Sequence, residues 1–244
     1  MLSYYNIFLF AITFLGGSIP LWGKKIEDNN MKYLLAFSGS FLLSITFLHL
    51  LPETFEELNT KAGLFLLLGF FIQLLIQRLT HGAEHGHTHI DHNHGHDHKT
   101  PLASILLGLS IHAFMEGLPL GFNYREIATE PSLYMAVAIH KLPEAMLVAA
   151  IVNKVSGKKQ AIITLALFSM ITPFSGMIAT KLGMTYQFMS NLVLALIPVV
   201  AGAFIHIATT IFFESGTKHH TLTIPKIIAI VLGVGIGLLT LLFE

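Results

Sequence analysis

Eight apolar runs, most of them roughly 20 residues long, decide what this chain can fold into. A helix of about 20 residues, rising about 1.5 Å per residue, crosses the hydrocarbon core of a bilayer. Hydrophobic residues make up 53% of the 244 residues and charged residues only 11%, which excludes a soluble globule and a disordered chain. We therefore predict an all-α membrane protein with eight spans. Their ranges are 3–23, 32–52, 62–79, 101–123, 131–154, 159–181, 186–213 and 222–243.

The lysine and arginine residues predict which side of the membrane each loop faces. Ten of the 14 lie between runs one and two, three and four, five and six, or seven and eight, and three lie on the other side. Cytoplasmic loops are enriched in Lys and Arg, so the loops that hold these ten residues are expected in the cytoplasm. Both termini are then expected on the outer side of the cell membrane. We predict one multi-pass domain, residues 1–244, with the lipid bilayer as its surroundings.

A histidine-rich segment separates the third run from the fourth. Residues 81–98 contain eight of the fourteen histidines, interleaved with Gly, Asp and Asn. Such a composition is typical of flexible metal-binding tracts, with a solvated linker as the alternative. We predict that residues 80–100 form a disordered cytoplasmic loop that binds metal. The segment does not identify a function, because storage, transport and chaperone proteins all carry similar tracts.

Two runs carry several ionisable residues at membrane depth, where such residues are costly and indicate function. His112 and Glu116 lie in the fourth run, and His140 and Glu144 in the fifth. Each pair is spaced i, i+4 and therefore shares one helix face. In antiparallel helices His112 reaches the depth of Glu144, and Glu116 that of His140. The spacing predicts four nitrogen and oxygen ligands converging near the middle of the bilayer.

Composition limits the chemistry of such a site. The chain has no cysteine, so a bound metal is held by nitrogen and oxygen atoms, which suits zinc, iron or manganese. Its formal net charge is zero, so no basic surface is available for nucleic acid.

The helix motifs resemble a known family. The segments 112–117, His-Ala-Phe-Met-Glu-Gly, and 140–145, His-Lys-Leu-Pro-Glu-Ala, are similar to the paired signatures of helices four and five of the ZIP family of metal-ion transporters. Weaker likenesses occur at 47–53, 172–176 and 201–204. A histidine-rich loop after the third helix and eight spans with external termini are also typical of this family.

The resemblance implies the family's 3+2+3 arrangement, in which the first and last three helices are inverted repeats around helices four and five. It also implies transport of zinc or another divalent metal toward the cytosol, and no enzymatic activity. The metal is then a transported ligand, and no catalytic cofactor is expected. His112, Glu116, His140 and Glu144 correspond to metal ligands of the family.

Three residues depart from the family pattern. Ala113 stands where many members have a polar ligand, and Met115 where some have proline. Lys141 stands where members with two adjacent metal sites have a carboxylate. An ammonium has no lone pair for a metal and must be paired at membrane depth, so we expect it to contact Glu116 and Glu144. The expected result is one metal ion per chain.

Other ionisable residues give weaker indications. His206 in the seventh run is either a pathway ligand or a packed core histidine, and the second interpretation is favoured. The second run ends in a group that could concentrate cations at the outer mouth or could be a solvated helix end. This group is His49, Glu53, Glu56 and Glu57.

Three rival functions remain to be compared. An intramembrane metal-dependent hydrolase needs a motif such as His-Glu-x-x-His or several histidine boxes in a helical context, and neither occurs in the spans. Cation-diffusion facilitators have six spans and a soluble C-terminal domain. A metal sensor that uses only the loop leaves the buried ligands unexplained. The sequence does not choose among zinc, iron, manganese and cadmium, and it leaves a homodimer open.

Overall fold

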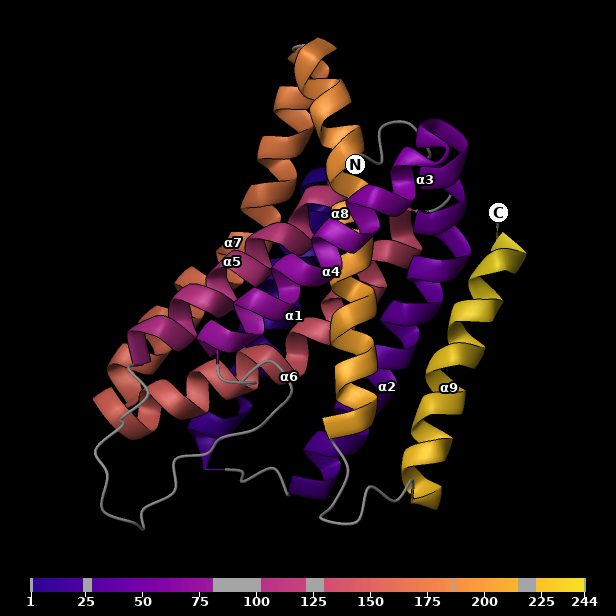
Figure 1. The fold of residues 1–244 in the computed structure, drawn as a ribbon. Coiled ribbons are helices and arrows are strands. Elements are labelled where there is room, and N and C mark those ends of the chain that lie inside the picture. The colour runs from indigo at the N-terminus through magenta and orange to yellow at the C-terminus, as the bar shows by residue number, and fades with distance from the viewer. Residues whose placement is uncertain are drawn as a thin grey trace.

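The computed structural model describes residues 2–23, 28–80, 102–121, 130–185, 187–214 and 223–243, and this part of the chain is almost entirely helical without a β-strand. The elements, labelled where there is room in Figure 1, are α1 (Leu2–Gly17), η1 (Ile19–Trp22), α2 (Asp28–Ile45), η2 (Thr46–Leu50), α3 (Leu51–Leu58), α4 (Lys61–Thr80), α5 (Leu102–Leu120), α6 (Glu130–Ser156), α7 (Lys158–Thr185), α8 (Gln187–Glu214), α9 (Ile224–Thr240) and η4 (Leu241–Phe243). The all-α prediction is confirmed.

The number of spans also agrees with the prediction. Within the described residues, seven helical segments are long and apolar enough to cross a membrane, and α9 adds a shorter apolar helix of 17 residues. The helices α2, η2 and α3 follow one another without a break and make one of these segments, Asn29–Leu58. The predicted histidine-rich loop, 81–98, lies outside the described residues. The inverted-repeat arrangement and the external position of both termini stay predictions.

Several helix boundaries differ by a few residues from those predicted, and the first two spans show why. The second span continues past residue 52 to Leu58, because the polar segment after Pro52 forms an amphipathic helical end. The first span changes at Ser18 from an α-helix to the short 3₁₀ helix η1. Pro20 has no backbone N–H and cannot continue an α-helical ladder, and Gly23 then ends the segment at φ 80°.

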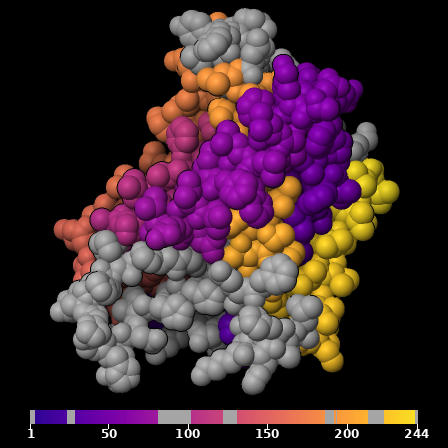
Figure 2. Space-filling view, viewed as in Figure 1, coloured from indigo at the N-terminus to yellow at the C-terminus, as the bar shows by residue number. Residues whose placement is uncertain are grey.

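The helices pack most extensively within two groups. One group contains α1, α5, α6 and α7, and the other contains α2, α4, α8 and α9. Figure 1 shows α9 beside α2 at the edge of the molecule, and in Figure 2 residues of α2, α3 and α4 cover much of the face toward the viewer. The two groups meet mainly where α2 packs on α6 and α4 packs on α5.

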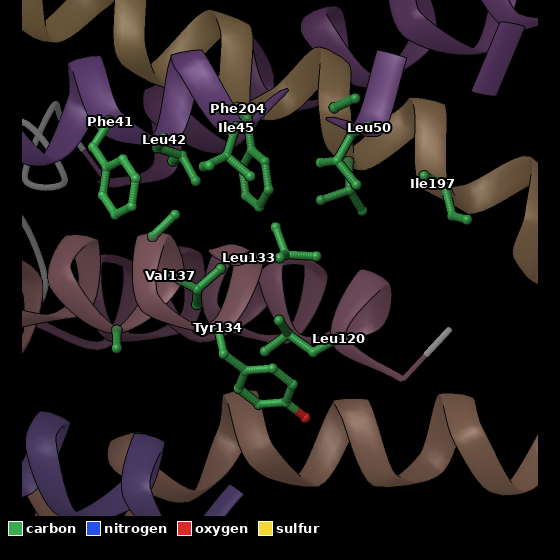
Figure 3. Close-up of a cluster of buried hydrophobic side chains, with 14 of the residues drawn as sticks. Phe41, Leu42, Ile45, Leu50, Leu120, Leu133, Tyr134, Val137, Ile197 and Phe204 are labelled. Atoms are coloured by element: carbon green, nitrogen blue, oxygen red, sulfur yellow. The ribbon is translucent and has the colours of Figure 1, made fainter. Parts of the chain in front are cut away.

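An apolar cluster fills much of the boundary between the two groups. Figure 3 shows side chains of α2 and α8, among them Phe41 and Phe204, pointing toward Leu133 and Val137 of α6. These side chains are almost completely buried. Because lipid tails are as apolar as these side chains, close van der Waals packing supplies the attraction between the groups in this region.

The helices α4 and α8 cross at unusually short range. A Cβ atom on Gly69 would lie 1.8 Å from the Val199 carbonyl oxygen, and one on Gly202 would lie 2.0 Å from the Leu66 carbonyl oxygen. Neither carbonyl belongs to a flexible side chain that could move aside. Glycine at both positions permits this close crossing, as small residues do in other membrane helix pairs.

Substituting Gly69 tests this packing. We expect Gly69→Ala to destabilise the protein by about 2 kcal/mol or more, because the methyl group overlaps the carbonyl of Val199. The matched control is Gly63→Ala on the same helix, where a Cβ meets nothing within 4 Å. Thermal unfolding in detergent, followed by size-exclusion chromatography, measures both. Equal stability of the two variants would contradict the close crossing.

Candidate metal centre

The four predicted ligands lie on two helices whose facing surfaces meet. His112 and Glu116 are one turn apart on α5, and His140 and Glu144 are one turn apart on α6. His112 contacts Glu144 across the helix pair, and Glu116 contacts His140. Later residues of α5 therefore contact earlier residues of α6. This is the antiparallel pairing that the sequence predicts.

Four donor atoms of these residues converge on a small volume. The Nε2 atom of His112 lies 3.1 Å from Oε1 of Glu116 and 2.8 Å from Oε1 of Glu144. The Nε2 atom of His140 lies 3.6 Å and 3.5 Å from the same two oxygens. The two imidazole rings are nearly perpendicular, with their centroids 6.1 Å apart. When one possible ligand atom is taken from each of the four residues, these four atoms all lie within 4.8 Å of one another.

These four possible metal-ligand atoms lie close together but are not aligned for hydrogen bonds with one another. Within the described part of the chain, the two Nε2 atoms and the two Oε1 atoms have no hydrogen-bond partner. All four side chains are at most 1% exposed. Buried polar atoms almost always have hydrogen-bond partners, so a group of four without them indicates a site shaped for something other than its own side chains. The arrangement could hold one metal ion.

Lys141 contacts the same two carboxylates through the oxygen atoms that do not face the imidazoles. Its Nζ atom pairs with Oε2 of Glu116 and Oε2 of Glu144. The side chain is 1% exposed, and Nζ lies 5.3 Å from the centroid of the Phe168 ring, which adds a cation–π contact. The predicted pairing of Lys141 with both glutamates is confirmed.

Apolar side chains enclose the site at both ends. Along α6, most residues from Leu133 to Ala138 belong to the cluster between the two helix groups, and most of those from Ala145 to Val152 belong to a second cluster. On α5 the order is reversed, with Leu109 in the second cluster and Leu120 in the first. The ionisable residues therefore occupy a short polar layer between two dry regions.

The helix α7 holds α5 in place through a repeated contact. Thr172 donates a hydrogen bond of 3.0 Å to the Ala113 carbonyl, and eight residues later Thr180 donates one of 3.0 Å to the Gly121 carbonyl. Between these bonds, a Cβ on Gly117 would lie 2.2 Å from the Thr172 carbonyl oxygen. Ala113 and Gly117 directly follow the two ligands of α5, so this contact sets the position of both ligands.

Sequence reasoning did not find the role of Thr172. The available signal was the repeat of small residues every four positions, at Ala113 and Gly117 on α5 and at Gly121 directly after it, which is typical of close helix contacts in membranes. The partner helix could not be identified from that repeat alone.

The remaining sequence candidates lie apart from this group of residues. His49, in the π-helical turn η2, is within hydrogen-bond distance of Thr240 on α9, with 2.8 Å between Nε2 and Oγ1. Glu56 and Glu57 are exposed on α3. His206 contacts the Phe70 ring edge-on, with centroids 4.8 Å apart, and is buried. This position agrees with the favoured interpretation of His206 as a packed histidine.

Comparison with known proteins gives an independent result. The ZIP zinc transporter family matches residues 2–106 and 91–240 of the chain. An Arabidopsis thaliana protein named "Probable zinc transporter 12" is 22% identical over an alignment of 225 residues, and the match covers 70% of this chain and 62% of that protein. The chain thus spans less than two thirds of the length of this relative.

The contact between α5 and α7 makes a specific prediction. Both Thr172→Val and Thr180→Val remove one interhelical hydrogen bond, and we expect each to cost about 0.6–2 kcal/mol of stability. Only Thr172→Val is expected to weaken binding of a divalent ion, by several-fold, because its bond ends next to His112. Isothermal titration with Zn²⁺, in chains whose eight histidines at 81–98 are replaced by serine, compares the two variants. Equal affinity in both would show that Thr172 does not position the ligands.

Proposed function

The chain belongs to the ZIP zinc transporter family, and we propose that it carries divalent metal ions, zinc foremost, across the membrane toward the cytosol by way of His112, Glu116, His140 and Glu144. The observation that carries the proposal is the convergence of four donor atoms without hydrogen bonds in a buried layer.

The distances between these atoms suit a zinc ion. Zinc binds His nitrogen and carboxylate oxygen at about 2.0–2.2 Å, so the edges of a tetrahedron around it measure about 3.3–3.6 Å. The four distances between nitrogen and oxygen in the site are 2.8, 3.1, 3.5 and 3.6 Å. Small side-chain movements suffice to bring all four atoms into coordination. Iron, manganese and cadmium also accept such ligands, and the name of the plant relative favours zinc among them.

The enclosure of the site supports movement by a carrier cycle. Apolar clusters lie on both sides of the ligands, and the ligand side chains are nearly inaccessible to solvent. An ion at this position is separated from water on either side until part of the packing opens. Alternate opening of the two sides would move the ion without forming a continuous pore.

The rival proposal of an intramembrane hydrolase receives less support. Such an enzyme requires a metal-bound water and a carboxylate free to accept its proton. Here each glutamate has one oxygen beside the imidazoles and the other paired with Lys141. The family assignment also favours a transporter over an enzyme.

Replacing the ligands one at a time tests the proposed site. We expect His112→Ala, Glu116→Ala, His140→Ala and Glu144→Ala each to reduce ⁶⁵Zn²⁺ uptake into proteoliposomes at least about tenfold, because each removes one ligand and leaves the others buried without a partner. The matched control is Lys181→Ala, which alters an exposed charged side chain on α7.

Two results of this assay decide the assignment. Near-normal uptake by any two of the four variants, at equal reconstitution, would contradict the proposed ligand set. Competition by unlabelled Fe²⁺, Mn²⁺ and Cd²⁺ in the same assay ranks the ions, and we expect Zn²⁺ to compete as strongly as any of them.

The histidine-rich segment is proposed to adjust transport rather than perform it. Histidines in water titrate near pH 6.5 and exchange metal without crossing the membrane. Replacing its eight histidines by serine is therefore expected to leave the maximal uptake rate within about twofold while lowering the number of bound ions. Complete loss of uptake by a folded variant would overturn this assignment.

A further inference from the structure

Gln73 is a polar side chain buried inside the membrane-spanning helix α4. It is 0% exposed, and within the described part of the chain neither Nε2 nor Oε1 of its amide has a hydrogen-bond partner. A buried amide without partners lowers the stability of a protein, and an apolar side chain of similar size would pack there without that cost. A group of this kind at membrane depth therefore indicates a function.

The face of α4 that carries Gln73 packs against two other helices. At Gly69 this face crosses α8, and at Thr80 it meets α5, where a Cβ on Gly108 would lie 2.5 Å from the Thr80 Cγ2 atom. At about 100° per residue, Gly69, Gln73 and Thr80 lie within about 40° of one another around α4. Gln73 thus lies between the contact with α8 and the contact with α5.

The depth of Gln73 is that of the metal centre. The helices α4 and α5 lie beside each other (Figure 1), and their contact joins the end of α4 to the start of α5, so they run antiparallel. Gln73 precedes Thr80 by seven residues, or about 10 Å. In the same direction along α5, His112 is about 6 Å beyond Gly108 and Glu116 about 12 Å. The amide therefore lies at a depth between these two ligands.

We propose that Gln73 is a transient ligand of the transported ion, which its amide oxygen contacts when the boundary between the two helix groups opens. The helix α4 belongs to the group that does not contain the ligand helices α5 and α6. Gln73 thus lies on the wall of the boundary opposite the metal centre. This inference rests on the proposed function, because it concerns the path by which an ion reaches or leaves that centre.

The chemistry of an amide suits a brief contact. Its oxygen can coordinate a divalent ion, and it carries no charge that would need compensation while no ion is bound. The usual protein ligands of zinc are imidazole, thiolate and carboxylate groups, which hold the ion more firmly. An ion in contact with Gln73 can therefore lose part of its water shell and still move on.

A purely structural role for Gln73 makes a different prediction. Polar residues that hold membrane helices together do so through hydrogen bonds between helices. The amide of Gln73 makes no such bond within the described residues. Replacing it by an apolar side chain is therefore expected to leave the packing of α4 intact.

The variant Gln73→Leu in the full-length chain tests the proposal. We expect its initial rate of ⁶⁵Zn²⁺ uptake into proteoliposomes to fall at least about fivefold, because the ion loses a ligand along its path. Its midpoint of thermal unfolding should equal or exceed that of the parent chain, since no hydrogen bond is lost. Its Zn²⁺ affinity should stay within about twofold, since all four ligands of the metal centre remain.

Affinity is measured by isothermal titration in chains whose eight histidines at 81–98 are replaced by serine. The matched control is Gln160→Leu, the same change at an exposed position on α7, which should leave all three quantities unchanged.

Three results would contradict the account. Parental uptake by Gln73→Leu would overturn the inference and leave the proposed metal centre intact. A lower unfolding midpoint together with weaker Zn²⁺ binding would also overturn it, because that pattern indicates a packing role. Absence of uptake by the parent chain would instead overturn the proposed function.

A second variant tests whether the oxygen atom is the part that acts. Gln73→Glu keeps the length of the side chain and an oxygen, and it removes the two N–H donors of the amide. We expect it to recover at least about half of the parental uptake rate, because an oxygen ligand is still present. Uptake as low as that of Gln73→Leu, in a folded protein, would show that Gln73 does not act as an oxygen ligand.

Discussion

Mutual compensation of charge in a buried layer is the interaction on which this structure depends. Two carboxylates, two imidazoles and one ammonium lie where water does not reach, and each carboxylate contacts partners through both of its oxygens. Removing any one member leaves the others with an uncompensated charge or lone pair in an apolar region. The helices α5 and α6 must therefore meet with these faces together, and the surrounding packing must keep them so.

The two helix groups divide this task. Both ligand helices belong to one group, where α7 packs on each of them and bonds to α5 beside the ligands. The other group contributes an apolar surface, with residues such as Phe41 and Phe204, that covers one end of the polar layer. The ligands can thus stay together while the apolar boundary between the groups changes. This separation of roles is consistent with the proposed transport site, which would have to bind an ion and later release it.

Much of the fold and of the candidate site could be predicted because each depends on a periodic pattern. The spans follow from the length of apolar runs, and the pairing of His112 with Glu144 follows from spacing along two antiparallel helices. The extension of the second span to Leu58 was missed, since an amphipathic helical end outside the apolar run has no hydropathy signal. The bond from Thr172 to Ala113 was missed because it joins residues 59 positions apart on helices that share no sequence pattern.

The sequence by itself determined the membrane character, the eight apolar helices, the two His/Glu pairs of the buried cluster and the need for Lys141 to be paired. These follow from transfer free energies and helix geometry, which act over a few residues at a time. Only the tertiary structure decided that Oε1 of each glutamate faces the imidazoles while Oε2 faces Lys141, and that α7 positions α5. Those details depend on how helices distant in sequence are rotated and spaced against one another, and the balance of packing over the whole bundle sets that rotation.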